Sequence, residues 1–519
     1  MSSRWARRAS GSTGRGGERA ERAGLAKWAG LGGPGSDRMT AGESVRSLPA
    51  ILPGFRPRPR WRELQLLVLV AIALFVGSVS LGATLRARAA GASDTPVPDG
   101  AFAPHDFTML VVYLGGLLVV HLAQVLAGRR CDQILLPAVG LLGGLSLLLM
   151  QRLPQTLAGQ LGGLAQTQLV WLLLALGVIA VLAVGVRSDS WLRLYKYTWA
   201  AVGVGLLVLT FIFGRDVNGA RLTLDLGPVS GQPSELLKVI LVVFLAGYLS
   251  EFRPLLVEQS TRLGPLRLPP LPYLAPMVAM WAIALGIVVI QRDLGAALLF
   301  FAVFLTLLYV ATARASYVVI GLALFVAGSA VMYRLFGHVQ QRVDIWLDPF
   351  VDPQGAGYQV VQALYAFGRG GILGTGLGNG LPSVGGRLPI PEIHTDFPLA
   401  ALGEELGLIG VLAILGLYLV VIERGLRIAA SAADDFRALL AAGLSLVVGV
   451  QAFIIAAGNL KIIPLTGITL PFISYGGSSL LANALVVGLL LALSDRGVEL
   501  RPPRPRRSRL ARIVDRGAR

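Results

Sequence analysis

The sequence concentrates acidic side chains in one short stretch, and these are the first residues that suggest chemistry. His394 and Asp396 stand just before a long apolar run, and the adjacent pair Glu404 and Glu405 lies within that run. A carboxylate inside lipid is costly, so residues of this kind are usually paired or functional. Two interpretations of Asp396 stay open: a general base at the membrane boundary, or the N-cap of a helix that begins at Phe397.

Two cations accompany a second apolar run. Arg221 lies in the stretch Asn218–Gly227, and Lys238 follows Ser234 and Glu235 where the run begins. Ser234 is suited to the N-cap of this helix and Glu235 to its first turn, where the helix dipole favours an acid. A lysine one turn into an apolar helix either snorkels to the surface or faces a polar cavity, where with Arg221 it would bind an anionic headgroup.

Other polar segments separate the apolar runs. Gln291–Gly295 places an Arg–Asp pair at a short turn, where such pairs are usually only solvated and a functional role is the alternative. A longer segment holds Arg342 and Asp344 and then the glycine-rich run Gly374–Gly380. That run superficially matches a dinucleotide-binding fingerprint, but no strand precedes it. A tight turn or a close backbone approach to a ligand is therefore expected instead.

The stretch Asn459–Ser479 is dense in Pro and Gly and contains the hydroxyls of Ser474 and Ser478. This composition predicts irregular backbone at membrane depth. Such backbone is tolerated only where it is buried in protein or lines a water-filled cavity. We therefore expect a cavity that opens to the outer side of the membrane.

These motifs are carried by a chain that is too apolar for a soluble protein. Hydrophobic residues make up 54% of its 519 residues and charged residues 14%, so lipid is the expected solvent. A bilayer core of about 30 Å needs roughly 20 apolar residues per helix, and the sequence predicts an all-α integral membrane protein with about twelve transmembrane helices. The predicted spans lie near Leu64–Thr84, Phe107–Ala127, Ile134–Met150, Gln168–Val186, Thr198–Phe213, Leu236–Leu249, Tyr273–Ile290, Leu294–Ala311, Tyr317–Met332, Phe397–Ile422, Ala438–Ala457 and Pro471–Leu493.

The distribution of Lys and Arg between alternate loops predicts that both termini are cytoplasmic. Residues 1–62 hold 13 Lys or Arg against 4 Asp or Glu, and residues 496–519 hold 9 against 2. Both are predicted to be basic cytoplasmic tails, the first of them disordered. Residues 63–132 would form two N-terminal helices, and 133–495 a membrane core. A large outer loop at 333–396 is expected to fold against the mouth of the bundle.

The rest of the composition excludes other classes of protein. The net charge of +17 resides almost entirely in the two tails, which favours anionic membrane lipid over nucleic acid as a partner. The single Cys131 rules out an internal disulfide, and four scattered histidines offer no metal-ligand cluster. The N-terminal segment lacks the apolar run and cleavage site of a signal peptide.

Taken together, these segments resemble the SEDS (shape, elongation, division and sporulation) family of RodA-, FtsW- and SpoVE-type proteins. The resemblance covers roughly Ile134 to Leu493, with the motifs in the family's order and at its spacing. Members are similar in having ten core spans, so the two helices before Ile134 are an N-terminal addition. The resemblance implies a peptidoglycan glycosyltransferase that polymerises lipid II at the outer face of the bacterial cytoplasmic membrane, in elongation or division. It also implies a class B penicillin-binding protein, a transpeptidase, as partner.

By position, the family's essential acid falls on Asp396 and the lysine of its Gln-Pro-Ser/Ala-Glu-Leu motif on Lys238. Glu404 and Glu405 match its Glu-Glu-Leu-Gly motif. Joining sugars requires a base for the acceptor hydroxyl and cations for the leaving pyrophosphate, so Asp396 is expected to be the base. The predicted substrate-binding residues are Arg221, Lys238, Arg342, His394, Thr395, Ser474 and Ser478, and the predicted structural residues are Glu235, Glu404, Glu405 and Asn459.

Several points stay open at this level. The phosphates would be bound directly or through a divalent cation, Mg²⁺ or Mn²⁺, which would be the only cofactor. The chain departs from the family at Thr223, Pro398 and Gly386–Arg387, where tryptophan, isoleucine and lysine are common, and these departures bear on elongation versus division. The alternative functions are a lipid II flippase and a noncatalytic membrane scaffold of the cell-wall machinery.

Overall fold

The fold is seen in a computed structural model, which describes residues 58–91, 107–155, 163–217, 220–225, 230–258, 261–263, 266–268, 271–380, 388 and 390–495. Residues 1–57 of the predicted N-terminal tail, the whole predicted C-terminal tail and the departure at Gly386–Arg387 lie outside these residues. The described helices are α1 (Trp61–Gly91), α2 (Thr108–Leu126), α3 (Leu135–Arg152), α4 (Leu164–Gly185), α5 (Ser190–Leu194), α6 (Lys196–Phe213), α7 (Pro233–Glu258), α8 (Leu271–Ile290), α9 (Leu294–Thr312), α10 (Ala315–Leu335), α11 (Gly337–Leu347), α12 (Tyr358–Gly370), α13 (Pro398–Ala430), α14 (Asp435–Asn459) and α15 (Gly477–Leu493).

Ten of the described helices are long and apolar enough to cross a membrane. Two shorter apolar segments, Ala275–Ile290 and Gly477–Leu493, also lie in helices, so every predicted span coincides with a helix. The prediction of an all-α, multi-pass membrane protein is confirmed, whereas the exact number of crossings stays a prediction. The last span was predicted to begin at Pro471, but α15 begins six residues later because Phe472 and Gly476 have positive φ angles, which no α-helix accommodates.

The charged turn at Gln291–Gly295 separates two helices, as the hairpin interpretation requires. Arg292 adopts a left-handed conformation (φ 64°), and Asp293 accepts a hydrogen bond from the Ala296 amide at 3.0 Å, which caps α9. The two helices α8 and α9 then pack against each other. Asp293 therefore has a structural role as the N-cap of α9 and is more than a solvated turn residue.

Short strands, which the sequence did not predict, lie in two of the connections. One antiparallel sheet joins α6 to α7 and comprises β1 (Arg215–Val217), β2 (Ala220–Asp225) and β3 (Ser230–Gly231). A hairpin of β4 (Thr261–Leu263) and β5 (Leu266–Leu268) joins α7 to α8. Thr223, one of the departures from the family pattern, pairs with Arg215 in the first sheet.

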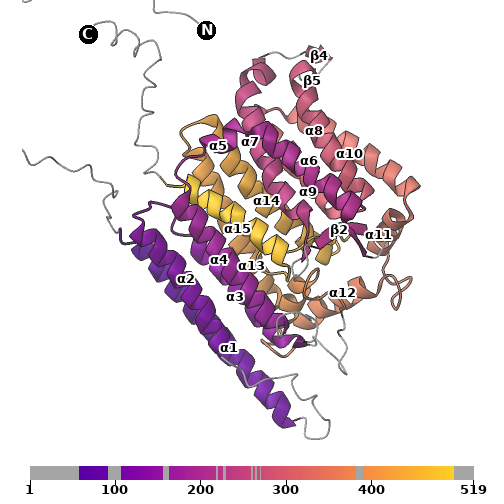
Figure 1. Cartoon of the computed structure of the whole chain (residues 1–519). Coiled ribbons are helices and arrows are strands. Elements are labelled where there is room, and N and C mark those ends of the chain that lie inside the picture. Colours follow the sequence, from indigo (N-terminus) through magenta and orange to yellow (C-terminus); the bar gives the residue numbers. More distant parts are fainter. Residues whose placement is uncertain are drawn as a thin grey trace, which may run out of the picture. The chain divides into compact units, whose positions relative to one another are not determined.

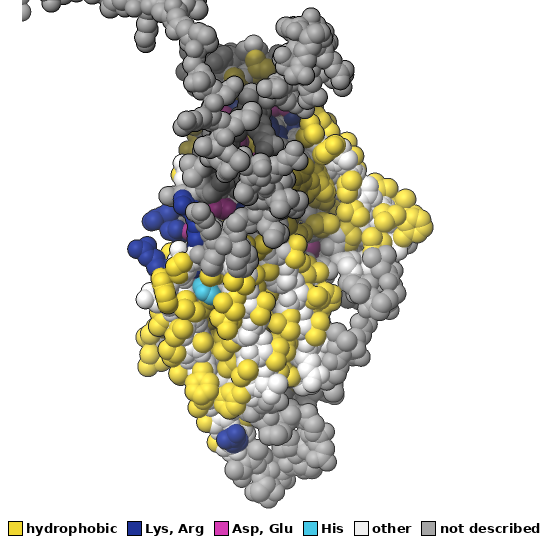
Figure 2. All heavy atoms as spheres, turned by 60° about the vertical axis from the view of Figure 1, so that its left-hand side comes forward, with side chains coloured by type: hydrophobic (Ala, Val, Ile, Leu, Met, Phe, Trp, Pro, Cys, Tyr) yellow, Lys and Arg dark blue, Asp and Glu magenta, His cyan; other side chains and the backbone are white. Residues whose placement is uncertain are grey.

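The helices form a bundle in which α14 is central (Figure 1). It packs against α7, α9, α13 and α15, while α15 packs along α4. The added helices α1 and α2 lie beside α3 and α4 at the edge of the bundle, and α10 lies at its opposite edge (Figure 1). The face of the molecule over the added helices is covered largely by hydrophobic side chains, with basic ones near its ends (Figure 2). That pattern is typical of a surface in contact with lipid.

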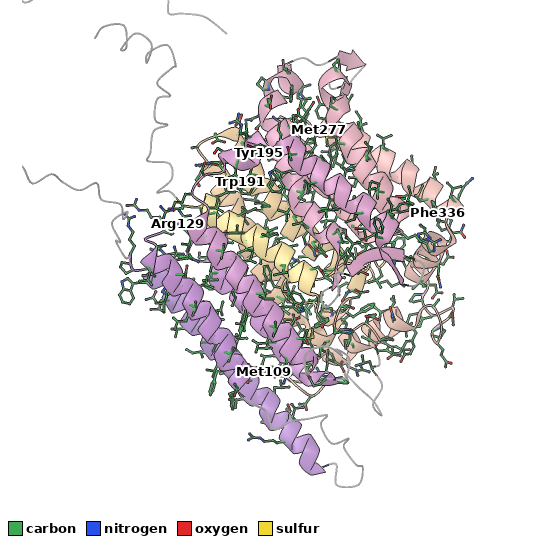
Figure 3. The ribbon with its side chains drawn as sticks, in the orientation of Figure 1. Met109, Arg129, Trp191, Tyr195, Met277 and Phe336 are labelled. Carbon is green, nitrogen blue, oxygen red and sulfur yellow. The ribbon has the colours of Figure 1, made fainter. Side chains whose placement is uncertain are left out.

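The two ends of the bundle differ. Arg129, Trp191 and Tyr195 lie at one end, and Met109 and Phe336 lie at the other (Figure 3). The long connection between α10 and α13 belongs to the second end and contains the short helices α11 and α12. Helix α12 of this connection packs against α13.

Helix α13 is interrupted at Gly407, whose φ of 67° and ψ of −168° are not helical. The break allows the amides of Leu408 and Ile409 to donate to the carbonyls of Gly371 and Ile372, at 2.9 and 3.2 Å. A Cβ atom at Gly407 would lie 2.3 Å from the Gly374 nitrogen, so only glycine fits this contact. The sequence predicted an uninterrupted span here, because nothing marks one glycine in an apolar run as a break.

Candidate functional site

The segment His394–Asp396 is held through its backbone. Its three carbonyl oxygens accept, in order, from the Tyr475 amide at 2.8 Å, the Ser474 hydroxyl at 2.6 Å and the Asn459 side-chain amide at 2.9 Å. All three donors belong to the end of α14 or to the loop before α15. The clamp fixes the backbone, and none of its three bonds uses a side chain of the segment.

The loop that supplies this clamp is itself secured by buried side chains. Tyr418 donates its hydroxyl to the Pro471 carbonyl at 2.6 Å, and Ser146 donates to the Ile473 carbonyl at 2.6 Å. Gln168 in turn donates to the Ser146 hydroxyl at 2.7 Å. Helices α3, α4 and α13 thus satisfy the irregular backbone that the sequence predicted at membrane depth.

Asp396 does not cap α13. The N-cap residue is Phe397, which has no side-chain capping bond, and Pro398 occupies the first helical position, where its missing N–H costs nothing. The capping interpretation of Asp396 was therefore wrong. The Pro398 departure from the family pattern finds its local explanation in this helix start.

The Asp396 carboxylate lies beside the Arg342 guanidinium. A Cβ atom at Gly467 would be 3.8 Å from Asp396 Oδ2 and 4.0 Å from Arg342 Nη2, so the missing side chain leaves the space between the two charges open. The pKa of Asp396 is raised to about 7, mainly by burial and also by the neighbouring Glu392 carboxylate, while Arg342 and the Thr395 hydroxyl act in the opposite direction. A carboxyl group with a pKa near 7 can take a proton and release it at neutral pH.

Arg342 is oriented by the same loop. Its Nη1 atom donates to the carbonyls of Leu465 and Thr466, at 3.2 and 3.1 Å. Its charge also lowers the pKa of Asp293, which burial raises above the ordinary value. Arg342 therefore acts electrostatically on two carboxyl groups, Asp293 and Asp396, that come from different connections of the bundle.

Unsatisfied polar atoms surround Asp396 within the part of the chain that the structure describes. They are His394 Nδ1, Asn459 Oδ1 and Thr466 Oγ1. Burial also lowers the pKa of His394, against the opposing effect of Glu392, so the ring is neutral at pH 7 and its free nitrogen can donate or accept. Buried polar atoms normally have partners, so these three are candidates for contacts with a polar ligand or water.

Lys238 does not snorkel to the surface. Its side chain is 2% exposed, which excludes snorkelling, and its ammonium donates to Glu235 at 2.6 Å, Gln451 at 2.7 Å and Asn483 at 3.1 Å. An ammonium has three N–H donors, and all three are used. Lys238 thus joins α7, α14 and α15, with the predicted structural residue Glu235 as its ion-pair partner, and its direct contact with substrate stays a prediction.

A small cavity lies next to this cluster. It has a volume of about 30 Å³, enough for a water molecule or an ion, and is lined in part by Gln232, Asp293, Glu235, Lys238 and Gly467. Gly467 also lies near Asp396 and Arg342, so this one residue borders both the cavity and the Asp396 region.

The three serines assigned from the sequence have structural contacts. Ser234 was expected to cap α7, but the helix begins at Pro233 and the Ser234 hydroxyl lies 3.4 Å from Asp293 Oδ2. Ser474, predicted to bind substrate, is buried and uses its hydroxyl on the Thr395 carbonyl and the Leu470 amide. Ser478 accepts from the Gln232 amide at 3.1 Å. Ser474 therefore positions the Thr395 backbone, and its direct contact with substrate stays a prediction.

The carboxylates of Glu404 and Glu405 face cations and backbone amides. Glu404 accepts from Arg369 Nε at 2.9 Å, and Glu405 forms a buried ion pair with Arg152. Glu405 also accepts from the Gly378 amide at 2.8 Å. These contacts join α13 to α3 and to the glycine-rich run, which is the kind of partnership expected from the sequence.

The glycine-rich run Gly374–Gly380 makes a sequence of tight turns. Gly374, Gly376 and Gly378 have φ angles of 81°, 94° and 84°. A Cβ atom at Gly374 would lie 2.1 Å from the Glu405 carbonyl oxygen. The run therefore serves close backbone approach, as the sequence suggested, although the approach is to protein.

Two of the remaining predictions are not resolved by the described side chains. Arg221 lies in β2, but its side chain is outside the described part of the molecule. Among the described residues, no group of three or more His, Cys, Asp or Glu side chains is arranged to hold a metal ion. Thr395 is placed beside Asp396 and donates to Glu392 Oε2 at 2.9 Å.

Sequence reasoning missed several partners within this site. Gln451 and Asn483 complete the coordination of Lys238, and Tyr418 and Gln168 secure the clamp loop. The signal was present, because amides and hydroxyls within apolar spans are seldom without a partner. Which of them meet across the bundle depends on helix packing, which spacing along one chain does not give.

Comparison with known proteins identifies relatives over most of this architecture. The family model described as "Cell cycle protein", that of FtsW, RodA and SpoVE, matches residues 132–497. The peptidoglycan glycosyltransferase RodA of Mycobacterium tuberculosis (strain ATCC 25618 / H37Rv) is 42% identical over 393 residues, 74% of this chain and 82% of that protein.

More distant relatives extend the similarity. RodA of Mycobacterium leprae (strain TN) is 40% identical over 72% of this chain and 80% of its own length. The probable peptidoglycan glycosyltransferase FtsW of Nitrosococcus halophilus (strain Nc4) is 40% identical over 62% of this chain and 80% of its own length. A solved structure described as "Structural coordination of polymerization and crosslinking by a peptidoglycan synthase complex" contains a chain with a TM-score of 0.57 and 28% identity, covering 72% of this chain and 99% of that one.

Proposed function

This chain belongs to the FtsW, RodA and SpoVE family of cell cycle proteins, and from that premise we propose which of its residues polymerise lipid II. The family membership and the fold make it a multi-pass membrane peptidoglycan glycosyltransferase. The proposal rests on one observation: Asp396 has a pKa of about 7 and lies beside Arg342, on a segment held by three consecutive backbone bonds.

In the proposed reaction the Asp396 carboxylate accepts the proton of the acceptor sugar's 4-hydroxyl. The hydroxyl oxygen then forms a bond to the anomeric carbon of the donor, and the bond from that carbon to the diphosphate oxygen breaks. Undecaprenyl diphosphate leaves with the bonding electron pair, and the proton stays on Asp396 until solvent takes it. General-base catalysis of this kind typically contributes 10²- to 10⁴-fold in rate, roughly, when the base is correctly placed.

Charge on the leaving diphosphate would be stabilised by Arg342, whose Nη1 is fixed by two carbonyls while Nη2 points toward the Gly467 space. His394 and Thr395 offer polar atoms to the sugars on the same side, and Arg221 is a second candidate for the phosphates. Lys238 acts indirectly in this proposal, because it fixes Glu235 next to the cavity. A divalent cation, Mg²⁺ or Mn²⁺, would supply further positive charge to the leaving diphosphate if it binds with the substrate.

We further propose that the Asp396 end of the bundle faces outward from the bacterial cytoplasmic membrane and that both termini are cytoplasmic. The basic composition of the tails supports this orientation under the positive-inside rule. A class B penicillin-binding protein is the proposed partner. The similarity to a chain from a peptidoglycan synthase complex that coordinates polymerisation with crosslinking supports that partnership.

The purified protein, incubated with lipid II, tests the assignment. Wild-type protein is expected to make glycan strands, and Asp396→Asn to make none, because asparagine keeps the size of the side chain but has no basic carboxylate. Asp396→Glu should retain at most a small residual rate, since the added methylene displaces the carboxylate. Thermal stability of Asp396→Asn should stay near wild type, because Asp396 caps no helix.

Polymerisation by Asp396→Asn at a rate near wild type would remove the base assignment. Wild-type protein that transfers labelled lipid II between leaflets without forming strands would instead support the flippase. If wild-type protein shows neither polymerisation nor lipid II transfer and instead binds another polymerase, the scaffold function would replace the polymerase and flippase functions.

A further inference from the structure

Helices α1 and α2 precede the region that matches the family model, which begins at residue 132, and they nevertheless contact the core at both ends. Along their length they pack against α3 and α4. Tyr113 of α2 donates its hydroxyl to the Gly140 carbonyl of α3 at 2.8 Å. A Cβ atom at Gly144 of α3 would lie 2.2 Å from the Leu74 side chain of α1, so α3 is shaped for this neighbour. The pair is therefore an integral layer of the described bundle.

At the Asp396 end, α1 touches the glycine-rich run. The Thr84 hydroxyl lies 2.9 Å from the Leu377 carbonyl, across 293 residues of sequence, and it also reaches the Leu81 and Ser80 carbonyls of its own helix at 2.9 and 3.1 Å. The next residue, Gly378, approaches so closely that a Cβ atom there would lie 2.3 Å from Thr84 Oγ1 and 3.1 Å from Leu81. Its φ of 84° already favours glycine, so conformation and contact both require glycine at this position.

The same residues of the run contact the helix that follows Asp396. Gly378 donates its amide to Glu405 Oε1 at 2.8 Å, and Gly376 donates to the Glu405 carbonyl at 3.0 Å. Glu405 is paired with Arg152 at the end of α3. A continuous set of contacts thus leads from Thr84 through the run to the first turns of α13, which begins two residues after Asp396.

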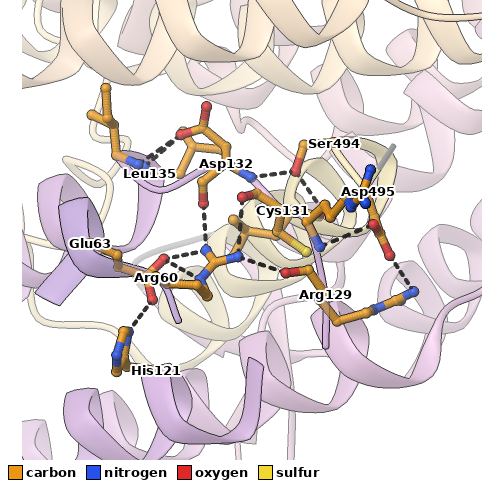
Figure 4. A network of polar contacts seen from close by, with 12 residues as sticks. Arg60, Glu63, His121, Arg129, Cys131, Asp132, Leu135, Ser494 and Asp495 are labelled. Atoms are coloured by element: carbon orange, nitrogen blue, oxygen red, sulfur yellow. Dashed lines mark hydrogen bonds and ion pairs between the residues drawn. The ribbon is translucent and has the colours of Figure 1, made fainter. Parts of the chain in front are cut away.

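At the opposite end, α1 is anchored by a buried charged cluster (Figure 4). Arg60 Nε donates to Glu63 at 3.1 Å, and His121 of α2 lies 2.7 Å from the other Glu63 oxygen. Arg60 also donates to the carbonyls of Cys131 and Asp132, at 3.1 and 2.8 Å. Arg60, Glu63 and His121 are all nearly inaccessible to solvent. Polar contacts are stronger in the low dielectric of a protein interior, so this anchor is firm.

The connection from α2 to α3 extends the anchor into the core. Arg129 pairs with Asp495 at 2.7 Å, at the end of α15, and donates to the Ala183 carbonyl of α4 at 2.7 Å (Figure 4). Asp132 accepts from Arg424 of α13 at 2.9 Å. Because one end of α1 is fixed in this way, the helix cannot slide along its axis relative to the core, and the position of Thr84 at its other end is set.

We propose that the α1–α2 pair positions the Asp396 region, and that Thr84 is the residue through which it does so. The inference deepens the proposed polymerase function and rests on it. The pair acts as a strut: the Arg60–Glu63–His121 cluster fixes its position at one end, and Thr84 holds Leu377 and Gly378 at the other. The glycine-rich run then keeps the start of α13 in the register that places the Asp396 carboxylate against the acceptor hydroxyl. Thr84 is a positioning residue and touches no substrate.

The test compares Thr84→Val with Thr84→Ser in full-length protein. Valine keeps the shape of threonine without the hydroxyl, whereas serine keeps the hydroxyl. The control is Thr306→Val in α9, whose hydroxyl donates only to the Ala302 carbonyl of its own helix. We expect Thr84→Val to lower kcat about fivefold with little change in KM for lipid II, Thr84→Ser to restore most of the rate, and Thr306→Val to match wild type.

Hydrogen exchange supplies a readout that is independent of activity. In Thr84→Val the amides of Gly376 and Gly378 should exchange faster than in wild type, while the melting temperature stays that of Thr306→Val. Rates and exchange in Thr84→Val that equal those of Thr306→Val would overturn the inference, as would failure of Thr84→Ser to recover the rate. If wild-type protein forms no strands, the proposed function fails, and the exchange comparison alone still decides whether Thr84 orders the run.

Discussion

At the scale of single residues, the backbone of Asp396 has the structural role, and its carboxylate is available for the reaction. Three hydrogen bonds hold the backbone of His394–Asp396. The Asp396 carboxylate does not cap a helix, because the N-cap of α13 is Phe397. Its neighbours are the Arg342 cation and the open space at Gly467. A side chain fixed through its backbone in this way stays in place when the carboxylate changes charge.

The raised pKa of Asp396 predicts a pH dependence of the reaction. A base works only when it is deprotonated, so the polymerisation rate should rise as the pH rises through about 7 and fall below it. Initial rates at saturating lipid II, measured across neutral pH alongside the melting temperature, check this. A rate that stays constant down to about pH 5, where an ordinary aspartate is still ionised, would contradict the assignment.

Glu405 illustrates a different kind of acid. Glu405→Gln should lower thermal stability in detergent, because the buried Arg152 loses its counter-charge, and breaking such a pair typically costs about 3–5 kcal/mol. Turnover by the fraction that remains folded should persist. The control is Glu423→Gln, which removes an exposed pair with Arg427 and should change stability by at most about 1 kcal/mol. Unchanged melting together with lost turnover would assign Glu405 to the chemistry.

At the scale of elements, the clamp loop before α15 is as important as any helix. Its left-handed Phe472 and its Pro and Gly content prevent regular structure, so its carbonyls need side-chain donors. Tyr418 and Ser146 supply them from helices distant in sequence, and Gln168 in turn donates to the Ser146 hydroxyl. The loop in turn supplies the donors that hold the Asp396 backbone.

Removal of one of these donors should loosen the loop. Tyr418→Phe leaves the Pro471 carbonyl without its hydroxyl partner and should destabilise the protein by about 1 to 3 kcal/mol, the usual cost of an unsatisfied buried group. Differential scanning fluorimetry in detergent measures the effect. Tyr309→Phe in α9 is the matched control, because that tyrosine is 45% exposed. Equal melting of the two variants would show that the Tyr418 bond is dispensable.

The elements were largely predictable, and the site only partly so. Each apolar run became a helix because lipid demands that backbone groups pair within the segment, a constraint readable from composition alone. The break at Gly407 and the start of α15 depend on contacts with Gly374 and with the clamp loop, which are properties of the packed bundle. Lys238 shows the same limit: its position in an apolar span marked it as important, but its three partners come from three helices.

At the scale of the whole molecule, charge and polarity are divided between the two ends of the bundle. The Asp396 end carries the clamp, the Arg342 guanidinium and the small cavity. The opposite end carries the Arg60–Glu63–His121 cluster and the ion pair of Arg129 with Asp495 (Figure 4). The protein can therefore perform its proposed reaction on the cell wall only if it is inserted with the Asp396 end facing outward.

That direction is testable with reporters. Fusions after Arg130, Arg267 and Arg519 should report the cytoplasm, and an insertion near Gly385 should report the outer side; Gly385 and Arg519 lie outside the described residues. The expectation follows from the Lys and Arg content of the tails and from the even number of helices that α1 and α2 add before the core. Paired reporters, one active only in the cytoplasm and one only outside, guard against a fusion that is merely unfolded. A cytoplasmic signal at Gly385 would place Asp396 on the side away from the growing wall, and the proposed reaction would then have no acceptor.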